Sequence, residues 1–510
     1  MISRRSAGLL TGGLLFALLL IFPPSGLSPE AARLAAVLAL AASWWITEAI
    51  PLPATALIAP SLAVLLGVAP AKEVFAPFGD PLLFLFIGSF LIAAAASRHG
   101  LDRRIAWLLL SRPALGRSRA RVLAAFVLLP AAISMWISNT ATAAMFLPVA
   151  IGVLEAMPRT AAERARVPFF DTAIVLAVSF GVSIGGIGTP VGTPPNLIGM
   201  GLIERVAQTN IGFFDWMTIA LPILLLLLPL CFGLLWLLYG RRDPGTREDL
   251  APALAALRTD LGPVSRGERA VASVFLLAVA LWVLPDLSGL VPGEDSPLHP
   301  LLAARLNEGV VALLAAGLLF LIPLGGPDAP DGRPPRALDW RTAAGIDWGT
   351  IVLFGGGMSL GTMMFSTGLA KHVAGGLLGP AAADTAAGVQ AGGGALFLAV
   401  AVAAGILVSE ATSNTASATM VVPVVIAFAQ QRGLPPVLPA IGATLACSFG
   451  FALPVSTASN AMAFGTGRAP LPRMMAAGLL LDAAGFLTIW LGLLALSALG
   501  YAPLLGSWIR

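Results

Sequence analysis

Long apolar stretches follow one another along almost the whole chain. A helix needs about 20 mostly apolar residues to cross a bilayer. The pattern therefore predicts eleven spanning helices, at residues 7–23, 31–50, 53–70, 81–98, 170–203, 216–239, 270–291, 307–324, 348–370, 437–467 and 474–499. This spacing is typical of an all-α polytopic membrane protein with about 11 transmembrane helices.

Two further apolar segments, residues 120–156 and 393–430, carry the polar triplet Ser-Asn-Thr near the middle. The apolar arm on either side of each triplet has about 12 to 20 residues, which is short for a full crossing. Polar backbone at membrane depth is tolerated where protein or a water-filled cavity surrounds it. We therefore expect two re-entrant hairpins, each of which enters and leaves the membrane on one face.

The two triplets belong to a longer internal repeat. SNTATAAMFLPV at residues 138–149 returns as SNTASATMVVPV at residues 413–424, with eight of twelve positions identical at an offset of 275. PVGTPPN at 190–196 returns as PVSTASN at 454–460, inside two predicted spans, and Leu-Phe-x-Gly at 85–88 returns at 353–356. The matching spans run in opposite directions in the predicted topology. The chain is thus expected to be an inverted-topology repeat, whose substrate and ion sites lie on discontinuous helices near the midplane.

Composition agrees with a membrane protein and excludes several other classes. The chain is 57% hydrophobic and 11% charged, whereas soluble domains carry about 25% charged residues. Its two cysteines, Cys231 and Cys447, stand in apolar surroundings and predict neither a disulfide framework nor a metal site. The net charge of +4 comes from loops, which argues against nucleic-acid binding.

Charge placement predicts the orientation. With the N-terminus inside, 23 of the 30 Lys and Arg residues fall in inner segments and seven in outer ones, as the positive-inside rule requires. The inner clusters lie at 4–5, 98–121, 159–166, 241–269, 333–341 and 468–473. We expect an inward-opening first hairpin, an outward-opening second one, a cytoplasmic N-terminus and a C-terminus outside. The 28 Arg against two Lys favour a GC-rich bacterium and its inner (plasma) membrane.

The residue types at the interruptions predict what these sites hold. A helix broken in the membrane frees carbonyls on one side and N–H groups on the other. Those carbonyls, with Ser, Thr and Asn oxygens, suit a small hard cation such as Na⁺, while N–H groups and positive helix ends suit carboxylate or sulfate oxygens. The SNT repeats and the broken spans contain no Lys or Arg. A bound anion therefore needs helix ends and co-bound cations to offset its charge.

The paired SNT motifs and CSFGFALPVSTASNAM at residues 447–462 resemble the divalent anion:sodium symporter (DASS) family, of the di- and tricarboxylate transporter type. Ala458-Ser459-Asn460 stands where that family often has Pro-Pro-Asn. The resemblance implies a homodimer in the lipid bilayer and an elevator-type transporter, in which a transport domain moves against a scaffold. It also implies Na⁺ as coupling ion, without an organic cofactor, and a small divalent anion as substrate.

The resemblance also divides the chain into regions. Residues 1–80 are expected to form N-terminal scaffold spans, and 81–215 the first repeat, with hairpin 120–156 and broken helix 170–203. Residues 216–347 are expected to add scaffold spans and a cytoplasmic loop at 240–268, and 348–510 the second repeat, with hairpin 393–430, broken helix 437–467 and the last span.

Carried over by position, the resemblance assigns three groups of site residues. The first sodium site is implied at Ser134, Ser138, Asn139 and Gly192. The second is implied at Ser409, Thr412 through its carbonyl, Asn414 and Ser456. The substrate-binding residues are implied to be Ser138, Asn139, Thr140, Thr193, Ser413, Asn414, Thr415 and Thr457.

These features predict sodium-coupled symport of C4-dicarboxylates such as succinate, malate and fumarate. A dicarboxylate/citrate exchanger or a sulfate transporter of the same family is the alternative, and a channel is a third interpretation. A membrane-embedded hydrolase at Ser359 is a remote one, because GMSLG at 357–361 fits the G-x-S-x-G elbow without its strand–turn–helix context.

Acidic residues in or beside the predicted spans need their own interpretation. Glu410, four residues before Asn414, is either a proton or cation partner or a neutral structural group, since charge at membrane depth is costly. Four aspartates near span starts are expected to be helix N-caps, namely Asp80, Asp171, Asp215 and Asp347.

Overall fold

The computed structural model describes residues 4–110, 118–156, 167–242, 262–289, 298–325, 335–378 and 393–500. In these ranges the chain forms helices and no strand, apart from one isolated bridge between Pro323 and Arg336. The expectation of an all-α fold is thus confirmed. Parts of the arginine-rich segments at 98–121, 159–166 and 240–268, and of the C-terminus, lie outside the described residues.

Helices run from one end of the described chain to the other. The first group is α1 (Arg4–Ile21), α2 (Pro29–Thr47), α3 (Leu52–Leu65), α4 (Ala71–Phe75), η1 (Ala76–Gly79), α5 (Pro81–His99) and α6 (Leu101–Leu110). The next is α8 (Arg119–Ser134), α9 (Asn139–Ala156), α11 (Phe169–Gly186), α12 (Pro194–Ala207), α13 (Phe213–Leu235) and η2 (Trp236–Gly240).

The later helices repeat this order after an intervening group. That group is α15 (Arg266–Gly289), α16 (Leu298–Arg305), α17 (Glu308–Leu321) and α18 (Trp340–Ala343). The last group is α19 (Trp348–Ser366), α20 (Leu369–Leu378), α22 (Gly394–Ala411), α23 (Asn414–Gln431), α24 (Val437–Ala446), α25 (Ala458–Gly465) and α26 (Leu471–Ala498).

Seven helical stretches among the described residues are long and apolar enough to cross a membrane. They are Ala71–His99, Phe169–Gly186, Phe213–Gly240, Arg266–Pro285, Trp348–Ser366, Gly394–Ala411 and Leu471–Ala498. Five shorter apolar helices accompany them, among them Leu52–Leu65, Glu308–Leu321 and Val437–Ala446. The number of eleven spans stays a prediction, because chain length alone does not fix which short helices cross.

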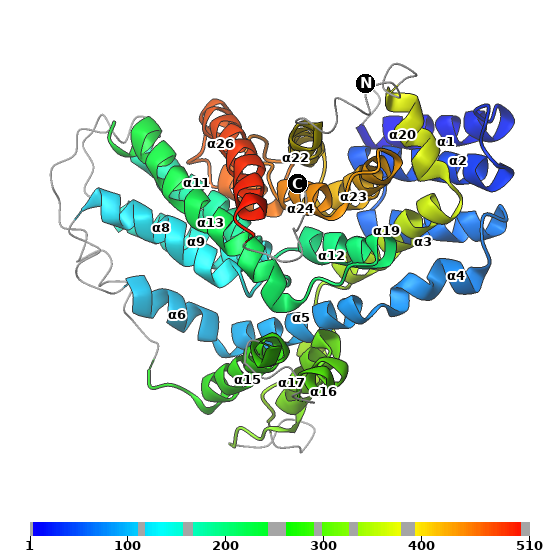
Figure 1. Ribbon diagram of the computed structural model, residues 1–510. Coiled ribbons are helices and arrows are strands. Elements are labelled where there is room, and N and C mark those ends of the chain that lie inside the picture. Colours follow the sequence, from blue (N-terminus) through cyan, green and yellow to red (C-terminus); the bar gives the residue numbers. More distant parts are fainter. Residues whose placement is uncertain are drawn as a thin grey trace.

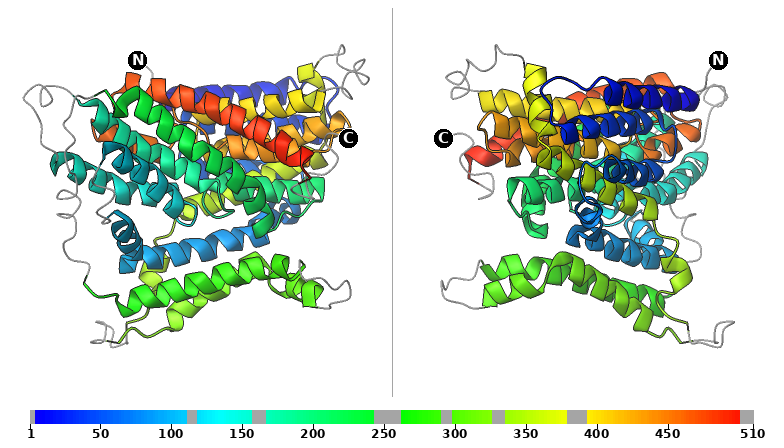
Figure 2. Two further views of the ribbon diagram at one scale, coloured as in Figure 1. Left: turned by 60° about the vertical axis from the view of Figure 1, so that its left-hand side comes forward. Right: turned by 90° about the vertical axis from the view of Figure 1, so that its right-hand side faces the viewer.

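Helix α11 is the most buried of the candidate spans among the described residues, with 94% of its residues buried. It packs against α8 and α9 of the first hairpin, against α13, and against α25 from the second half (Figure 1). On the other side α24 packs against both arms of the second hairpin, α22 and α23. Figure 2 shows α15 to α17 as a separate layer beside α5.

The packing of the outer helices follows the internal repeat. Helix α5 packs against α17, and α19 packs against α3. A Cβ at Gly88 of α5 would lie 2.4 Å from the Ala312 carbonyl carbon, and one at Gly356 of α19 would lie 2.3 Å from the Ala56 carbonyl oxygen. Only glycine fits so close an approach, so the two Leu-Phe-x-Gly motifs make the same helix contact in each half.

The matched phenylalanines of these motifs meet each other. The Phe86 and Phe354 rings lie edge to face, with centroids 5.6 Å apart and planes at 72°. This arrangement is among the favoured geometries for aromatic pairs. Residues related by the repeat thus touch where α5 and α19 meet.

Two of the four aspartates expected at helix starts are N-caps. Asp80 accepts from the backbone N–H of Leu82 at 2.9 Å, and Asp347 accepts from that of Thr350 at 3.1 Å. Both therefore satisfy an N–H that has no partner within the helix.

The same expectation is wrong for the other two, which lie inside the first helical turn. Helix α11 starts after Pro168, so Asp171 stands within it, where it pairs with Arg468 at 2.5 Å. Asp215 is the third residue of α13 and accepts from the backbone N–H of Gly212 at 3.1 Å. Proximity to a span start therefore does not tell a cap from a first-turn residue.

Candidate functional site

The first SNT motif forms the tip of a helical hairpin. Helix α8 ends at Ser134 and α9 begins at Asn139. The buried Ser134 hydroxyl donates to Asn139 Oδ1 at 2.7 Å, and Ser138 Oγ accepts from the Ala141 backbone N–H at 3.3 Å. These bonds orient the asparagine and satisfy an orphan N–H of α9.

The second SNT motif has the same geometry. The Ser409 hydroxyl lies 2.8 Å from Asn414 Oδ1 and 2.8 Å from the Cys447 carbonyl oxygen. Ser413 caps α23 by accepting from the Ala416 backbone N–H at 3.3 Å. Thr412 turns its hydroxyl to the Trp45 carbonyl on α2, at 3.3 Å. Of the Thr412 oxygens, the carbonyl is therefore the better candidate ligand.

Each interrupted helix is closed by an asparagine. Asn196 donates through Nδ2 to the carbonyls of Gly186 and Thr189, at 2.9 and 2.7 Å. Asn460 donates to those of Gly450 and Leu453, at 2.7 and 3.0 Å. Each asparagine thus donates to the carbonyls of the residues ten and seven positions before it. Sequence reasoning identified the repeated motif but missed this bracing role of its last residue.

The first hairpin tip contacts the first interruption. The Thr189 hydroxyl donates to the Met135 carbonyl in a short hydrogen bond. A Cβ at Gly192 would lie 2.5 Å from the Gly186 carbonyl oxygen and 3.0 Å from that of Met135. The absence of a side chain at Gly192 thus leaves backbone carbonyls close to the tip that carries Ser134, Ser138 and Asn139. The structure brings together the residues expected for the first sodium site.

The second tip contacts the second interruption through a charged residue. The Ser456 hydroxyl lies 3.0 Å from the Glu410 carbonyl oxygen and 2.9 Å from Glu410 Oε2. The Glu410 carboxylate also accepts from the backbone N–H groups of Ala452 at 2.7 Å and Leu453 at 3.2 Å. Ser456 therefore bonds to Glu410, the residue after Ser409, which was expected to be either a proton or cation partner or a neutral structural group.

The two halves of the site meet between α11 and α25. The buried Ser179 hydroxyl donates to Asn460 Oδ1 at 2.7 Å, and the Phe180 and Phe451 rings lie edge to face at 5.1 Å. The repeat relates Ser179 to Ser448, since Ser-Phe-Gly at 179–181 returns at 448–450, and it relates Asn460 to Asn196. Yet Ser448 Oγ and Asn196 Oδ1 are buried without a hydrogen-bond partner among the described residues. The halves thus share chemistry but differ in this connection.

The residues expected to bind substrate differ in access. Thr140 is exposed, whereas Asn139, Asn414 and Thr415 are half-buried. Thr193 is buried at 2% exposure. Thr457 caps α25 by accepting from the Asn460 backbone N–H at 3.1 Å. In the described parts of the chain, no hydrogen bond joins the two SNT tips directly, so the structure places each tip with its own interruption.

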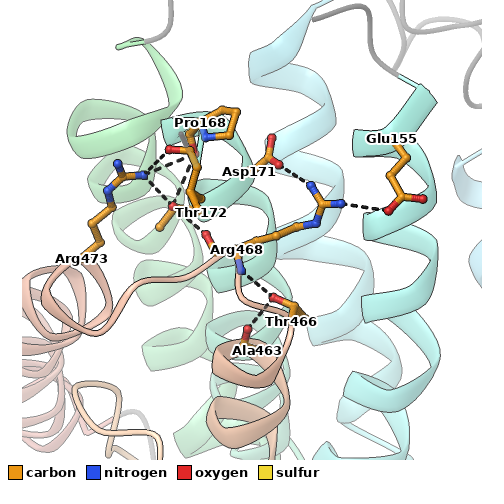
Figure 3. Close-up of polar contacts among 9 residues, drawn as sticks. Glu155, Pro168, Asp171, Thr172, Ala463, Thr466, Arg468 and Arg473 are labelled. Carbon is orange, nitrogen blue, oxygen red and sulfur yellow. Dashed lines mark hydrogen bonds and ion pairs between the residues drawn. The ribbon is translucent and has the colours of Figure 1, made fainter. Parts of the chain in front are cut away.

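A basic cluster fastens the second half to the first (Figure 3). Arg468, between α25 and α26, pairs with Asp171 at 2.5 Å and Glu155 at 2.9 Å. The Thr172 hydroxyl donates to the Arg468 carbonyl at 2.9 Å, and Arg473 donates to the Thr172 hydroxyl at 3.0 Å. These contacts hold the end of the second interrupted helix against α9 and α11.

Ser359 lies in a setting unlike a nucleophile elbow. It is within α19 and donates to the Val74 carbonyl at 2.6 Å. A Cβ at Gly357 would lie 2.6 Å from Thr419, and one at Gly361 would lie 2.7 Å from Leu202. GMSLG is therefore a close helix-packing face, as its G-x-x-x-G spacing also indicates.

Two SNT-tipped hairpins set against two interrupted helices define a membrane transport protein with an internal repeat. The chain belongs to the sodium:sulfate symporter family, whose transmembrane region matches residues 7–508. It is a multi-pass protein of a bacterial membrane.

Curated relatives match over most of their length. The sodium-dependent dicarboxylate transporter SdcS of Staphylococcus saprophyticus is 31% identical over 476 residues, which cover 92% of this chain and 87% of the relative. SdcS of Staphylococcus aureus is 30% identical over 481 residues, with the same coverage.

Solved transporters share the fold. The YdaH transporter of Alcanivorax borkumensis superposes with a TM-score of 0.53 at 17% identity, covering 85% of this chain and 87% of that one. MtrF of Neisseria gonorrhoeae gives 0.56 at 13% identity, covering 97% and 95%. At such identities the likeness concerns the fold alone.

Proposed function

We propose that this protein couples inward movement of Na⁺ to uptake of C4-dicarboxylates such as succinate, malate and fumarate. The observation that carries the proposal is the matched Ser–Asn hydrogen bond at both hairpin tips, 2.7 Å at Ser134–Asn139 and 2.8 Å at Ser409–Asn414. The relatives named as sodium-dependent dicarboxylate transporters support the coupling ion and the substrate class.

Each tip offers oxygen ligands of the kind that Na⁺ accepts. Hard cations take hydroxyl, amide and carbonyl oxygens, and both tips provide these. The residues proposed for the first site include no carboxylate. The first site uses Ser134, Ser138, Asn139 and Gly192, and the second uses Ser409, Thr412, Asn414 and Ser456.

The dicarboxylate binds between the tips. Helices α9 and α23 begin at Asn139 and Asn414, so their N-terminal N–H groups and positive ends favour a carboxylate at each. Thr140 and Thr415 add hydroxyl donors, with Ser138, Ser413, Thr193 and Thr457 lining the same space. Na⁺ binds first, because ordered tips and added positive charge are both needed before a divalent anion becomes stable there.

Translocation follows an elevator mechanism in a homodimer. The hairpins and interrupted helices move together against the remaining spans, with the N-terminus in the cytoplasm and the C-terminus outside. Transport does not use Ser359 as a nucleophile, since its hydroxyl is committed to the Val74 carbonyl.

Labelled succinate uptake into proteoliposomes tests the proposal. With an inward Na⁺ gradient, uptake should rise above its equilibrium value, and choline in place of Na⁺ should abolish the overshoot. Uptake that needs internal dicarboxylate but not Na⁺ would mean an exchanger, and saturable uptake of sulfate alone would mean a sulfate carrier. Either result would overturn the proposal. The Ser359→Ala variant should transport like the wild type, whereas a hydrolase with Ser359 as its nucleophile would lose its activity.

A further inference from the structure

The second half of the site has a pair of carboxylates that the first half lacks. At the repeat offset of 275, Glu410 corresponds to Met135. The partner carboxylate, Asp482, lies in the middle of α26 and is 6% exposed. A charge at membrane depth is costly and marks a functional candidate, so two acidic side chains on one side of the site require an explanation.

The glycines one turn on either side of Asp482 show which face of α26 lies against the second interruption. A Cβ at Gly478 would lie 2.4 Å from the backbone N and Cα of Ala452, and one at Gly485 would lie 2.4 Å from the Phe449 ring. Residues three and four apart share a helix face. Asp482 therefore stands on the face of α26 that contacts residues 449–452, where Glu410 binds the Ala452 N–H.

The two carboxylates differ in how they are satisfied. Glu410 accepts from two backbone N–H groups and from the Ser456 hydroxyl. Both carboxylate oxygens of Asp482 are buried, and the groups that interact with Asp482 are the Glu410 carboxylate and the Phe451 backbone. Two buried carboxylates side by side need either a proton or a positive charge.

Protein cations near Asp482 do not supply that charge. The helices packed on α26 are α11, α13, α22 and α24, and their acidic residues besides Glu410 are Asp171 and Asp215, both in first helical turns. Arg473 lies nine residues before Asp482, about 13 Å along the helix, and donates to the Val167 carbonyl. Among the described residues, no Lys, Arg or His forms an ion pair with Asp482.

We propose that Asp482 and Glu410 form a third Na⁺ site, behind the second hairpin tip. The inference rests on the proposed sodium-coupled function and deepens it. The two buried carboxylates offer hard oxygens of the kind that a small cation prefers, and the pH dependence of transport tests a proton shared between them. Through Ser456, which contacts Glu410 and belongs to the second sodium site, this third ion stabilises the interruption that completes that site.

Equilibrium binding of ²²Na⁺ to the purified full-length protein, without dicarboxylate, tests the site. Asp482→Asn keeps the shape and removes the charge, so it should bind one Na⁺ equivalent fewer at saturation than the wild type. Asp215→Asn removes one charge from a helix start and should bind as many as the wild type. Asp482→Ser is the second variant if the amide version does not fold, as checked by gel filtration.

Thermal unfolding gives an independent readout. Asp482→Asn should unfold at a higher temperature than the wild type in Na⁺-free buffer, because an uncompensated buried charge is gone. It should also gain less from added Na⁺, since bound ions stabilise only the state that binds them.

Unchanged Na⁺ stoichiometry in Asp482→Asn would overturn the third site. Loss of only the pH dependence of transport in this variant would overturn it too, because the pair would then hold a proton. These failures are distinguishable from failure of the proposed function. If the proposed function fails, the wild type itself would bind no Na⁺. If only the third site fails, Asn139→Ala and Asn414→Ala would still lower Na⁺ binding.

Discussion

Each SNT asparagine is oriented by a serine five residues earlier. Ser134 and Ser409 hold the side-chain oxygens of Asn139 and Asn414 at 2.7 and 2.8 Å, and both serines are fully buried. The helix break alone leaves the amide free to rotate. The buried hydroxyl fixes it, so the serines position the ligands as well as contributing oxygens of their own.

Removing either hydroxyl should therefore weaken Na⁺ binding. A net hydrogen bond contributes about 1 kcal/mol, and the loss of a ligand oxygen adds to this, so Ser134→Ala and Ser409→Ala should each raise the half-saturating Na⁺ concentration roughly tenfold or more. Uptake of succinate against Na⁺ concentration measures this. Ser359→Ala, another buried serine in a helix, is the control. Wild-type Na⁺ dependence in both variants would contradict the assignment of these serines.

At the residue scale, the sequence predicts which residue types form the site better than it predicts their contacts. Repetition of SNT indicated the tips, and family resemblance indicated which oxygens gather there. The bracing by Asn196 and Asn460 and the backbone N–H bonds of Glu410 depend on how an interrupted helix folds back, which no periodicity encodes. Asp482 was missed because it stands alone in an apolar span, far from both motifs in the chain.

At the scale of elements, a hydrogen bond joins α11 to α25. The two residues that the repeat relates to its partners do not form the matching bond. Ser179 bonds Asn460 Oδ1, whereas Ser448 and Asn196 Oδ1 are buried and unpaired in the described residues. Ser179→Ala should cost about 1–3 kcal/mol of unfolding free energy, because it leaves a buried acceptor unsatisfied. Ser448→Ala should cost almost nothing, since it removes an unpaired group.

Denaturant or thermal unfolding of the two variants, measured side by side, tests this difference. They are matched in substitution, burial and place in the repeat, so each controls for the other. Equal destabilisation would show that the two halves are connected alike.

The helical elements could be expected largely from the sequence, but their extents could not. The hairpin arms were expected at 120–156 and 393–430, and α8 with α9 and α22 with α23 occupy these ranges. Helices α3, α17 and α24 have only 14, 14 and 10 residues, shorter than the apolar stretches that contain them. Proline, glycine and tertiary packing end a helix before hydrophobicity does.

At the scale of the whole molecule, ion pairs outside the apolar stretches fix the layers. Arg98 at the end of α5 pairs with Asp339, the N-cap of α18, at 2.6 Å. The Thr342 backbone N–H, followed by the Arg98 guanidinium, holds the pKa of Asp339 below its ordinary value. Such a lowered pKa stabilises the fold above the unfolded-state pKa, and this contribution is lost as pH falls through the folded-state value.

Asp339→Asn should therefore lower the unfolding temperature by the same amount at pH 6 and pH 8, where the carboxyl is ionised in both states. The difference from the wild type should shrink below about pH 4, the ordinary range of an aspartate. Thermal unfolding across pH 3–8 measures it. A difference that grows on acidification would contradict the direction of this pKa shift.

The overall architecture was the most predictable feature, since hydropathy and the repeat already indicated an all-α inverted-repeat transporter. The contact between Phe86 and Phe354 was not predictable. Nor was the packing of α17 on α5 and of α3 on α19, in which each of these helices contacts the other half of the chain. They follow from three-dimensional symmetry, which the sequence records only as a weak Leu-Phe-x-Gly echo.

Succinate binding to the purified protein, with and without Na⁺, tests most directly whether the two tips act as coupled ion and anion sites. The wild type should bind saturably with Na⁺ and should lose that binding when choline replaces it. Asn139→Ala and Asn414→Ala should each abolish Na⁺-dependent binding while the proteins remain folded. Undiminished binding in either variant, or equal binding of the wild type in choline, would contradict the account.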